Sequence, residues 1–242
     1  MLKVKNLTKS YAGSNVKAVD NLTFNLRSGE IYGFLGPNGA GKTTTIKMIT
    51  GILPYSQGEI TVCGNNLKTC PMKAKKSIGF VSDTHVVYDK LTGREYVNFM
   101  ADIYEVSEED RQKRAEKLLN LFRLTDAFDK QICTYSHGMK QKISIIGALI
   151  HNPAIWILDE PMTGLDPESS HQLKTLMREH CENGNVVFFS THVLEVAEKI
   201  CDRIGIISNG VLIKEGTVEE IKSTSADKTL EDVFLSLTDK EE

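Results

Sequence analysis

The segment that most constrains this chain is a glycine-rich loop between an apolar run and a helix-like stretch. The apolar run is Ile31–Leu35, and residues 44–50 continue with a helical pattern that ends at Gly51. The loop has the spacing Gly-x-x-x-x-Gly-Lys-Thr, and together with the residue after it comprises Gly36, Pro37, Asn38, Gly39, Ala40, Gly41, Lys42, Thr43 and Thr44. In this strand–loop–helix context the spacing is typical of a P-loop, whose backbone N–H groups bind phosphate at a helix N-terminus.

Within this loop, two side chains have expected partners. Lys42 should reach the β- and γ-phosphates of a nucleotide, and the hydroxyl of Thr43 should serve Mg²⁺. The alternative is a glycine-rich turn that binds nothing. The strand before the loop and the helix after it favour nucleotide binding.

Two carboxylates follow a second apolar run at residues 155–158. These are Asp159 and Glu160. Ligands gather at the carboxyl ends of parallel strands, so Asp159 should lie beside the loop and suit Mg²⁺. Glu160 faces the other way and suits a general base or water-positioning residue opposite the γ-phosphate. The alternative, a solvated turn, is the better interpretation only where no P-loop accompanies the pair.

The remaining pattern predicts an α/β fold, a P-loop NTPase with a RecA-like parallel-sheet core. Alternating apolar residues before Ile31 predict a small N-terminal antiparallel β-subdomain. Residues 83–151 read as helices and predict an inserted α-helical subdomain. Short apolar strands alternating with helices then resume, and Asn209-Gly210 predicts a type I′ hairpin. We therefore expect a core of 1–82 and 152–222, the insertion 83–151, and a helical tail at 223–242.

Composition narrows the class further. The 242 residues suit one domain of 1–242, and a net charge of −3 gives no reason to expect a nucleic-acid partner. The longest uncharged stretch, 143–158, is shorter than the roughly 18 residues that a membrane span needs. The first residues contain no apolar h-region, so we expect no signal peptide. The five cysteines include no Cys-x-x-Cys pair, so we expect reduced thiols rather than a metal site.

One absent motif and four motifs that are present distinguish among nucleotide-binding classes. The guanine-recognition tetrapeptide Asn-Lys-x-Asp is absent. Residues 135–139 read Tyr-Ser-His-Gly-Met before a helix, Leu165-Asp166 follows the acidic pair, His192 follows a strand, and Tyr11 precedes the second strand. With these motifs in this order, essentially the whole chain resembles the ATP-binding subunit of ATP-binding-cassette (ABC) transporters.

The resemblance implies roles for five residues. Tyr11 would stack on adenine, although a lone surface tyrosine is the simple alternative. Ser136 and Gly138, in the signature motif, would bind the γ-phosphate of ATP held by the other subunit. Asp166 would communicate between the two sites, or serve only as a helix N-cap. His192 would be the switch histidine that touches the γ-phosphate and Glu160, or a structural histidine.

Two departures from the family pattern stand out. The signature motif Leu-Ser-Gly-Gly-Gln is changed to Tyr135, Ser136, His137, Gly138 and Met139. Asp83 stands where the family has a glutamine. A carboxylate can accept from metal-bound water or bind Mg²⁺, but it cannot donate as an amide does. The alternative is that Asp83 is a loop-surface residue.

The resemblance also implies partners. One P-loop cannot form a two-site ATPase, so a homodimer or a paired homologous subunit is expected, together with separate transmembrane permease subunits. The insertion and the loop 83–92 would dock onto these subunits. The chain would then be cytoplasmic and peripheral on the membrane. Details of 135–141, 188–192 and 230–235 resemble bacterial ABC-2-type exporters. The alternative is a non-transport ABC ATPase of a regulatory, translation or DNA-repair type.

Overall fold

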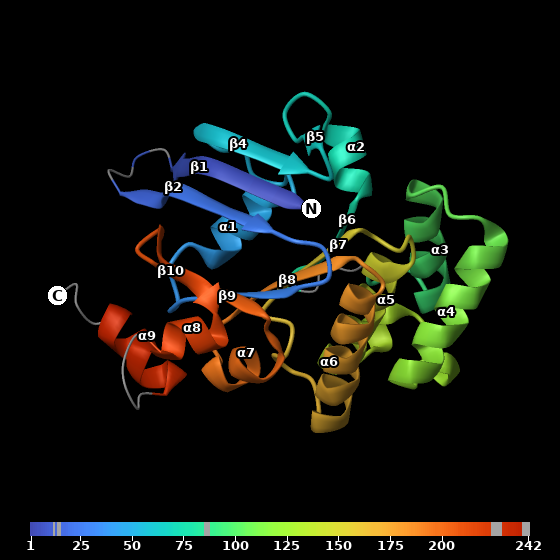
Figure 1. Cartoon of the computed structure of the whole chain (residues 1–242). Helices are drawn as coiled ribbons and strands as arrows, with labels where there is room; N and C mark the ends of the chain where they lie inside the picture. Colours follow the sequence, from blue (N-terminus) through green and yellow to red (C-terminus); the bar gives the residue numbers. More distant parts are fainter. Residues whose placement is uncertain (12, 14–15, 85–87, 224–228, 239–242) are drawn as a thin grey trace.

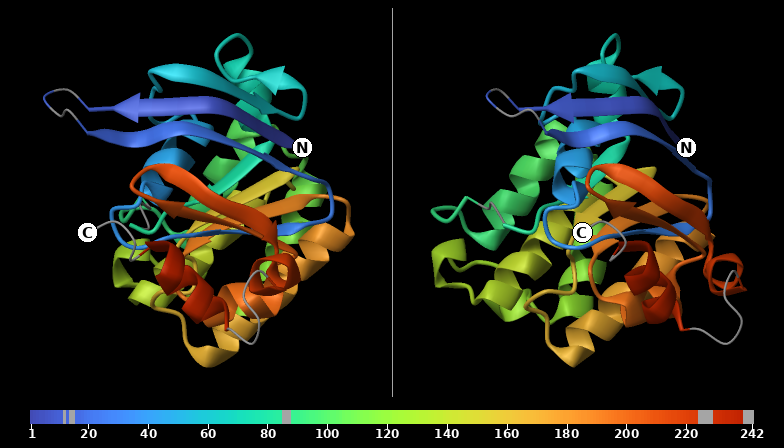
Figure 2. Two further views of the ribbon diagram at one scale, coloured as in Figure 1. Left: turned by 60° about the vertical axis from the view of Figure 1, so that its left-hand side comes forward. Right: turned by 90° about the vertical axis from the view of Figure 1, so that its left-hand side faces the viewer.

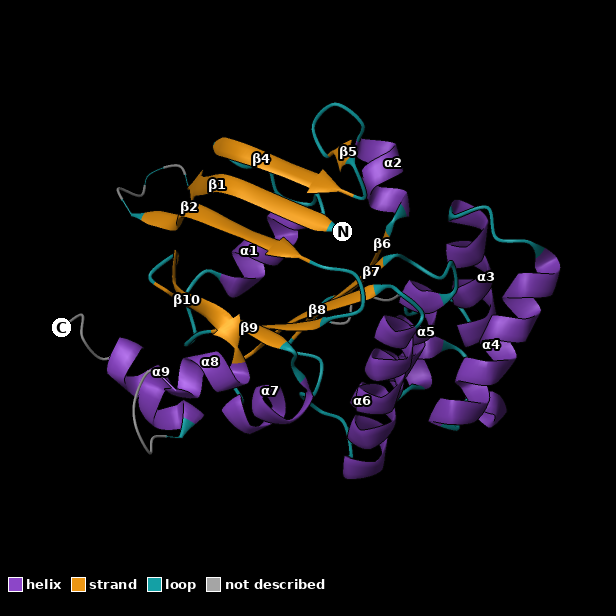
Figure 3. Ribbon diagram, viewed as in Figure 1, coloured by secondary structure: helices purple, strands orange, loops and turns teal. Residues whose placement is uncertain are grey.

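The computed structural model describes residues 1–11, 13, 16–84, 88–223 and 229–238 (Figure 1). Two sheets lie one above the other, with most helices at one end and below (Figure 3). No helix in these described ranges has the length and apolar character required to cross a bilayer.

The smaller sheet is antiparallel, as predicted. Its order is β2-β1-β4-β5, and its strands are β1 (Leu2–Ser10), β2 (Lys17–Leu26), β4 (Gln57–Val62) and β5 (Asn65–Asn66). In β2, Leu22, Phe24 and Leu26 are buried while the residues between them are exposed. This alternation places one face of the sheet on the core.

The larger sheet has the order β10-β9-β3-β8-β7-β6. Its strands are β3 (Ile31–Leu35), β6 (Ile78–Val81), β7 (Ile155–Asp159), β8 (Val186–Thr191), β9 (Arg203–Ser208) and β10 (Val211–Thr217). All neighbours pair in parallel except β9 and β10. Asn209 and Gly210 join these two with φ of 47° and 78°, which confirms the predicted hairpin. The carboxyl ends of β3, β7 and β8 therefore meet at one edge.

Nine α-helices lie within the described residues. They are α1 (Lys42–Ile49), α2 (Pro71–Lys76), α3 (Gly93–Ile103), α4 (Glu108–Phe122), α5 (His137–Leu149), α6 (Pro167–Glu182), α7 (Leu194–Ile200), α8 (Val218–Ser223) and α9 (Leu230–Thr238). The sequence did not predict α2, α8 or β5, since none exceeds six residues. α1 begins at Lys42, where the helix after the glycine-rich loop was expected to start, because Gly41 (φ 104°) ends the loop at that point.

The chain between β6 and β7 supplies α3, α4 and α5, whereas β6 and β7 pair directly with each other. The apolar face predicted for α4 is confirmed, because Ala115, Leu118, Leu119 and Phe122 are buried. The boundaries at 82 and 152 remain predictions.

The helix α1 lies between the two sheets (Figure 2). Its Ile46 and Ile49 share one apolar cluster with residues of both sheets. Four aromatic rings from β2, β3 and β8 pack beside it with centroids 5.5–5.9 Å apart, namely Phe24, Tyr32, Phe34 and Phe188. The helix that follows the glycine-rich loop is thus packed against β2 of the smaller sheet and β7 of the larger sheet.

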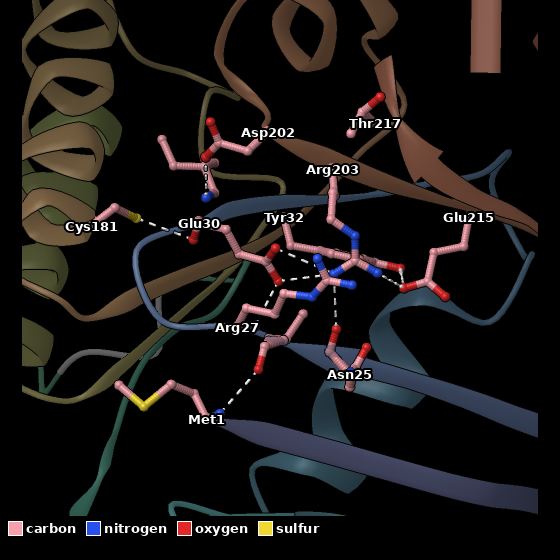
Figure 4. A network of polar contacts seen from close by, with 12 residues as sticks. Met1, Asn25, Arg27, Glu30, Tyr32, Cys181, Asp202, Arg203, Glu215 and Thr217 are labelled. Atoms are coloured by element: carbon pink, nitrogen blue, oxygen red, sulfur yellow. Dashed lines mark hydrogen bonds and ion pairs between the residues drawn. The ribbon is translucent and has the colours of Figure 1, made fainter. Parts of the chain in front are cut away.

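A buried charge network fixes the other end of β3 (Figure 4). The Arg203 guanidinium lies 3.1 Å from Glu30 and 2.5 Å from Glu215. Glu30 also accepts the backbone N–H of Arg27 at 2.6 Å. The Tyr32 hydroxyl donates to Glu215, and burial raises the pKa of Tyr32 well above its ordinary value. The network ties the start of β3 to β9, β10 and the end of β2.

Candidate nucleotide-binding site

The glycine-rich loop connects β3 directly to α1, as the sequence predicted. Two of its glycines leave no room for a side chain. A Cβ on Gly36 would lie 2.8 Å from Cγ2 of Ile207, and one on Gly41 would lie 2.6 Å from the carbonyl oxygen of Ala18. Gly41 also has a φ of 104°, which favours glycine. The tight loop is therefore dictated by these two positions.

The loop lines a cavity of about 240 Å³. Its lining residues are Ala18, Asn38, Gly39, Gly41, Lys42, Thr43, Thr44, Asp83 and Glu160. Lys42 is buried, and its ammonium donates to the carbonyl oxygens of Gly36 at 2.7 Å and Pro37 at 3.1 Å. The positive charge is thus held at the floor of the cavity, where an anion would meet it.

Asp159 ends β7 beside the loop and is 1% exposed. Its Oδ1 accepts a 2.5 Å hydrogen bond from the Ser190 hydroxyl. Burial raises the pKa of Asp159, while hydrogen bonds from Ser190 and Thr43 oppose that rise; the charges of Asp83 and Glu160 add to it. Its buried Oδ2 has no hydrogen-bond partner among the described residues. A buried carboxylate oxygen beside a threonine hydroxyl and a second carboxylate is a donor set that fits Mg²⁺.

Glu160 sits between two basic groups. Its Oε1 lies 3.5 Å from Nζ of Lys42, and its Oε2 lies 3.0 Å from Nδ1 of His192. The residue has a left-handed φ of 48°, so the chain turns sharply after β7. Its backbone N–H donates to the Ser190 hydroxyl at 3.0 Å. The structure therefore brings Lys42, Glu160 and His192 together.

Asp83 follows β6 and lines the same cavity. Its Oδ1 accepts from the Ser82 hydroxyl at 3.0 Å. This placement brings a third carboxylate to the edge where β6 and β7 end. Whether it acts on Mg²⁺ or on a metal-bound water is still a prediction.

Tyr11 lies just beyond β1 and is 46% exposed. Its hydroxyl is 3.3 Å from Oγ1 of Thr44, and Nζ of Lys9 lies 5.4 Å from its ring centroid. The ring is thus adjacent to the start of α1. Adenine stacking remains a prediction.

The signature segment lies elsewhere. Ser136 caps α5 and accepts from the backbone N–H of Met139 at 3.3 Å. Neither Ser136 nor Gly138 lines the cavity formed by the glycine-rich loop. The capped start of α5 therefore lies away from this cavity in the same chain, and phosphate binding by Ser136 and Gly138 is still a prediction.

Asp166 is the N-cap of α6. It accepts from the Ser169 hydroxyl at 2.5 Å and from the Ser169 backbone N–H at 2.8 Å. These two hydrogen bonds lower the pKa of Asp166 to about 2. The capping role that the sequence left open is confirmed, and its communicating role is still a prediction.

Known proteins can now be compared with this geometry. The sequence model of the family described as ABC transporter matches residues 19–163. The chain belongs to the ABC transporter family. The linearmycin resistance ATP-binding protein LnrL of Bacillus subtilis (strain 168) is 38% identical over 230 residues, which cover 95% of this chain and 73% of LnrL.

Solved structures agree with this assignment to the ABC family. The structure of an ABC transporter's ATP-binding subunit has a TM-score of 0.93 and 33% identity, covering 98% of this chain and 99% of that chain. The dimeric post-hydrolysis structure of the cassette MJ0796, bound to ADP and Pi, has a TM-score of 0.81 and 28% identity. The match covers 90% of this chain and 98% of that chain. The chain is an ABC ATPase: it binds ATP and hydrolyses it for a transporter.

Two substitutions in the ABC signature motif face inward. Tyr135 is buried, and its hydroxyl donates to the carbonyl of Ala127 at 2.6 Å. Met139 packs, half-buried, against the core of the inserted helices. Both substitutions are therefore explained by packing inside the insertion.

Sequence reasoning missed two side chains of this ABC site. Ser190 bridges Asp159 and Glu160, and its only signal was a polar residue at the end of an apolar strand. Gln141 is fully buried, and its amide donates to the carbonyl of Pro161. A glutamine one turn into a helix carries no such signal.

Proposed function

We propose that this ABC ATPase works as a dimer, of two copies or of one copy with a paired homologue. The supporting observation is that the glycine-rich loop and the signature serine line different surfaces of one chain. An ATP held in the cavity therefore lacks the Ser136 helix start unless a second subunit supplies it. The dimeric MJ0796 structure is a precedent for such an arrangement.

In this proposal, Glu160 positions the water that attacks the γ-phosphate. The carboxylate lies at the carboxyl edge of the sheet, 3.0 Å from His192 and 3.5 Å from Lys42. His192 orients the carboxylate through Nδ1, while Lys42 and the loop N–H groups stabilise negative charge on the phosphates. Thr43, Asp159 and Asp83 would hold Mg²⁺, which would neutralise negative charge on the phosphates.

The observation that carries this mechanism is the placement of Glu160 between Lys42 and His192. Its test is Glu160→Gln, which keeps the shape of the side chain and removes its basicity. ATP binding should persist, while turnover falls at least about a hundredfold, the usual contribution of a positioned base. Near-wild-type hydrolysis by Glu160→Gln would refute the assignment.

We further propose that the inserted helical subdomain (83–151) docks onto membrane-spanning permease subunits, which would hold the ATPase at the cytoplasmic face. Exposed apolar side chains gather on this part, with Tyr88 packed edge-on against Phe99 at 5.4 Å and Ile103 half exposed. Exposed aromatic and aliphatic groups of this kind are typical of interaction sites. LnrL, a resistance protein, supports export as the direction of transport.

Co-purification from membranes distinguishes this function from the non-transport alternative. A stoichiometric membrane subunit, lost on Phe99→Asp but retained on Phe24→Leu, supports docking through the insertion. Stoichiometric ribosome or DNA instead would overturn it.

A further inference from the structure

The segment that follows Glu160 lies against the first two turns of α5. We define it as the post-Glu160 loop, residues 161–166. The buried amide of Gln141 donates to the carbonyl of Pro161 at one end of this loop. Nζ of Lys142 lies 3.5 Å from Oδ2 of Asp166 at the other end. α5 therefore holds both ends of the loop.

The middle of the loop meets α5 at Gly164. A Cβ built on Gly164 would lie 2.7 Å from Nε2 of His137 and closer still to Cδ2. The next residue of the helix is also near the loop, because a Cβ on Gly138 would lie 3.3 Å from the carbonyl oxygen of Gly164. The imidazole thus fills the space that a side chain at 164 would need.

The loop is joined to Glu160 by its own hydrogen bonding. The backbone N–H of Thr163 donates to the carbonyl of Glu160 at 3.2 Å. Glu160 itself has the left-handed φ that begins this turn. A shift of Gly164 therefore moves the turn in which Glu160 stands.

We propose that His137 is a positioning residue for hydrolysis. Its imidazole packs against Gly164 in the space that a larger residue at 164 would fill, and through this contact α5 sets the position of Glu160. The family motif has glycine where His137 stands, so this contact is a property of this sequence. The inference rests on the proposed role of Glu160.

A double-mutant cycle tests the contact. Gly164→Ala should lower kcat at least tenfold, because the new Cβ displaces either the imidazole or the loop. His137→Ala alone should lower kcat severalfold. The double variant His137→Ala/Gly164→Ala should recover at least threefold over Gly164→Ala, since the clash is gone. Losses that simply multiply would overturn the proposal.

Matched controls separate the effect of the contact between His137 and Gly164 from the strain of an alanine at a positive φ. Gly164 has φ +79°, so alanine is strained there whatever the space; Gly64 has φ +80° with nothing within 4 Å of its Cβ position. Gly64→Ala should leave kcat unchanged, as should His171→Ala on the exposed side of α6. If Gly164→Ala leaves kcat as unchanged as Gly64→Ala does, the contact between His137 and Gly164 does not position Glu160.

Two further readouts complete the experiment. ATP affinity of the dilute protein should stay within error across the cycle, and the thermal unfolding midpoint of Gly164→Ala should fall no further than that of Gly64→Ala, because a merely structural defect would lower both beyond the strain of alanine at a positive φ. Glu160→Gln is run alongside. If that variant hydrolyses ATP, the proposed mechanism fails; if it is inactive and the cycle is multiplicative, only the role of His137 fails.

Discussion

The hydroxyl of Ser190 donates a 2.5 Å hydrogen bond to Oδ1 of Asp159. The same hydroxyl oxygen accepts the backbone N–H of Glu160 at 3.0 Å. One side chain from β8 therefore locks both carboxylates at the end of β7. A neighbouring strand is the natural place for such a lock, because Asp159 and Ser190 are directly opposite in the parallel pairing.

Replacing Ser190 should impair hydrolysis. Ser190→Ala leaves a buried carboxylate oxygen and a backbone N–H without their partner, which costs roughly 1–3 kcal/mol. If this loss falls on the transition state, kcat falls about 5- to 150-fold. Steady-state ATPase assays measure it. Ser208→Ala, a buried serine at the end of β9, is the control, and equal turnover in the two variants would contradict the lock.

Asp83 should affect the Mg²⁺ requirement. Its carboxylate lines the cavity, and its charge raises the pKa of Asp159. Asp83→Ala should raise the Mg²⁺ concentration for half-maximal ATPase about tenfold, as for residues that hold metal-bound water. Asp20→Ala, which removes a carboxylate of β2 that is 38% exposed and paired with Lys17, should not change this concentration. An unchanged Mg²⁺ titration for Asp83→Ala would leave it a loop-surface residue.

The sequence was most informative where function depends on local spacing. Gly36, Gly41 and Lys42 are close together in the chain, and Asp159 ends an apolar strand, so short patterns were sufficient to predict the cavity and its edge. The parallel sheet followed from the same apolar runs.

Long-range polar pairs could not be predicted in this way. Arg203 and Glu30 are 173 residues apart, and Gln141 and Pro161 belong to a helix and a loop whose contact depends on the whole fold. The helix α2 was missed because six residues do not establish a period. Tertiary packing decides each of these features.

The Arg203 network should contribute to stability. The side chains of Arg203 and Glu30 are only 12% and 9% exposed. Arg203→Ala leaves Glu30 as an uncompensated buried charge, so the free energy of unfolding should fall by about 3 kcal/mol. Urea denaturation measures it. Arg94→Ala, which breaks an exposed ion pair with Asp129, should have a much smaller effect, and comparable losses would contradict a stabilising role for the buried network.

His180 should make stability depend on pH. Burial lowers the pKa of His180 to about 4, and its Nε2 has no partner among the described residues. The unfolded chain has an ordinary histidine pKa near 6.5 and binds a proton between pH 6.5 and 4 that the folded chain does not. The contribution of His180 to the free energy of unfolding is therefore fully present above pH 6.5. It is lost as the pH drops, by about 2 kcal/mol from pH 6.5 to 5. His180→Gln and His180→Phe should both remove that part of the slope, whatever their absolute stability, while His171→Gln on the same helix is the control. Urea midpoints at pH 5, 6 and 7 measure the slope, and a slope equal to that of the wild type in both His180 variants would show that His180 does not cause it.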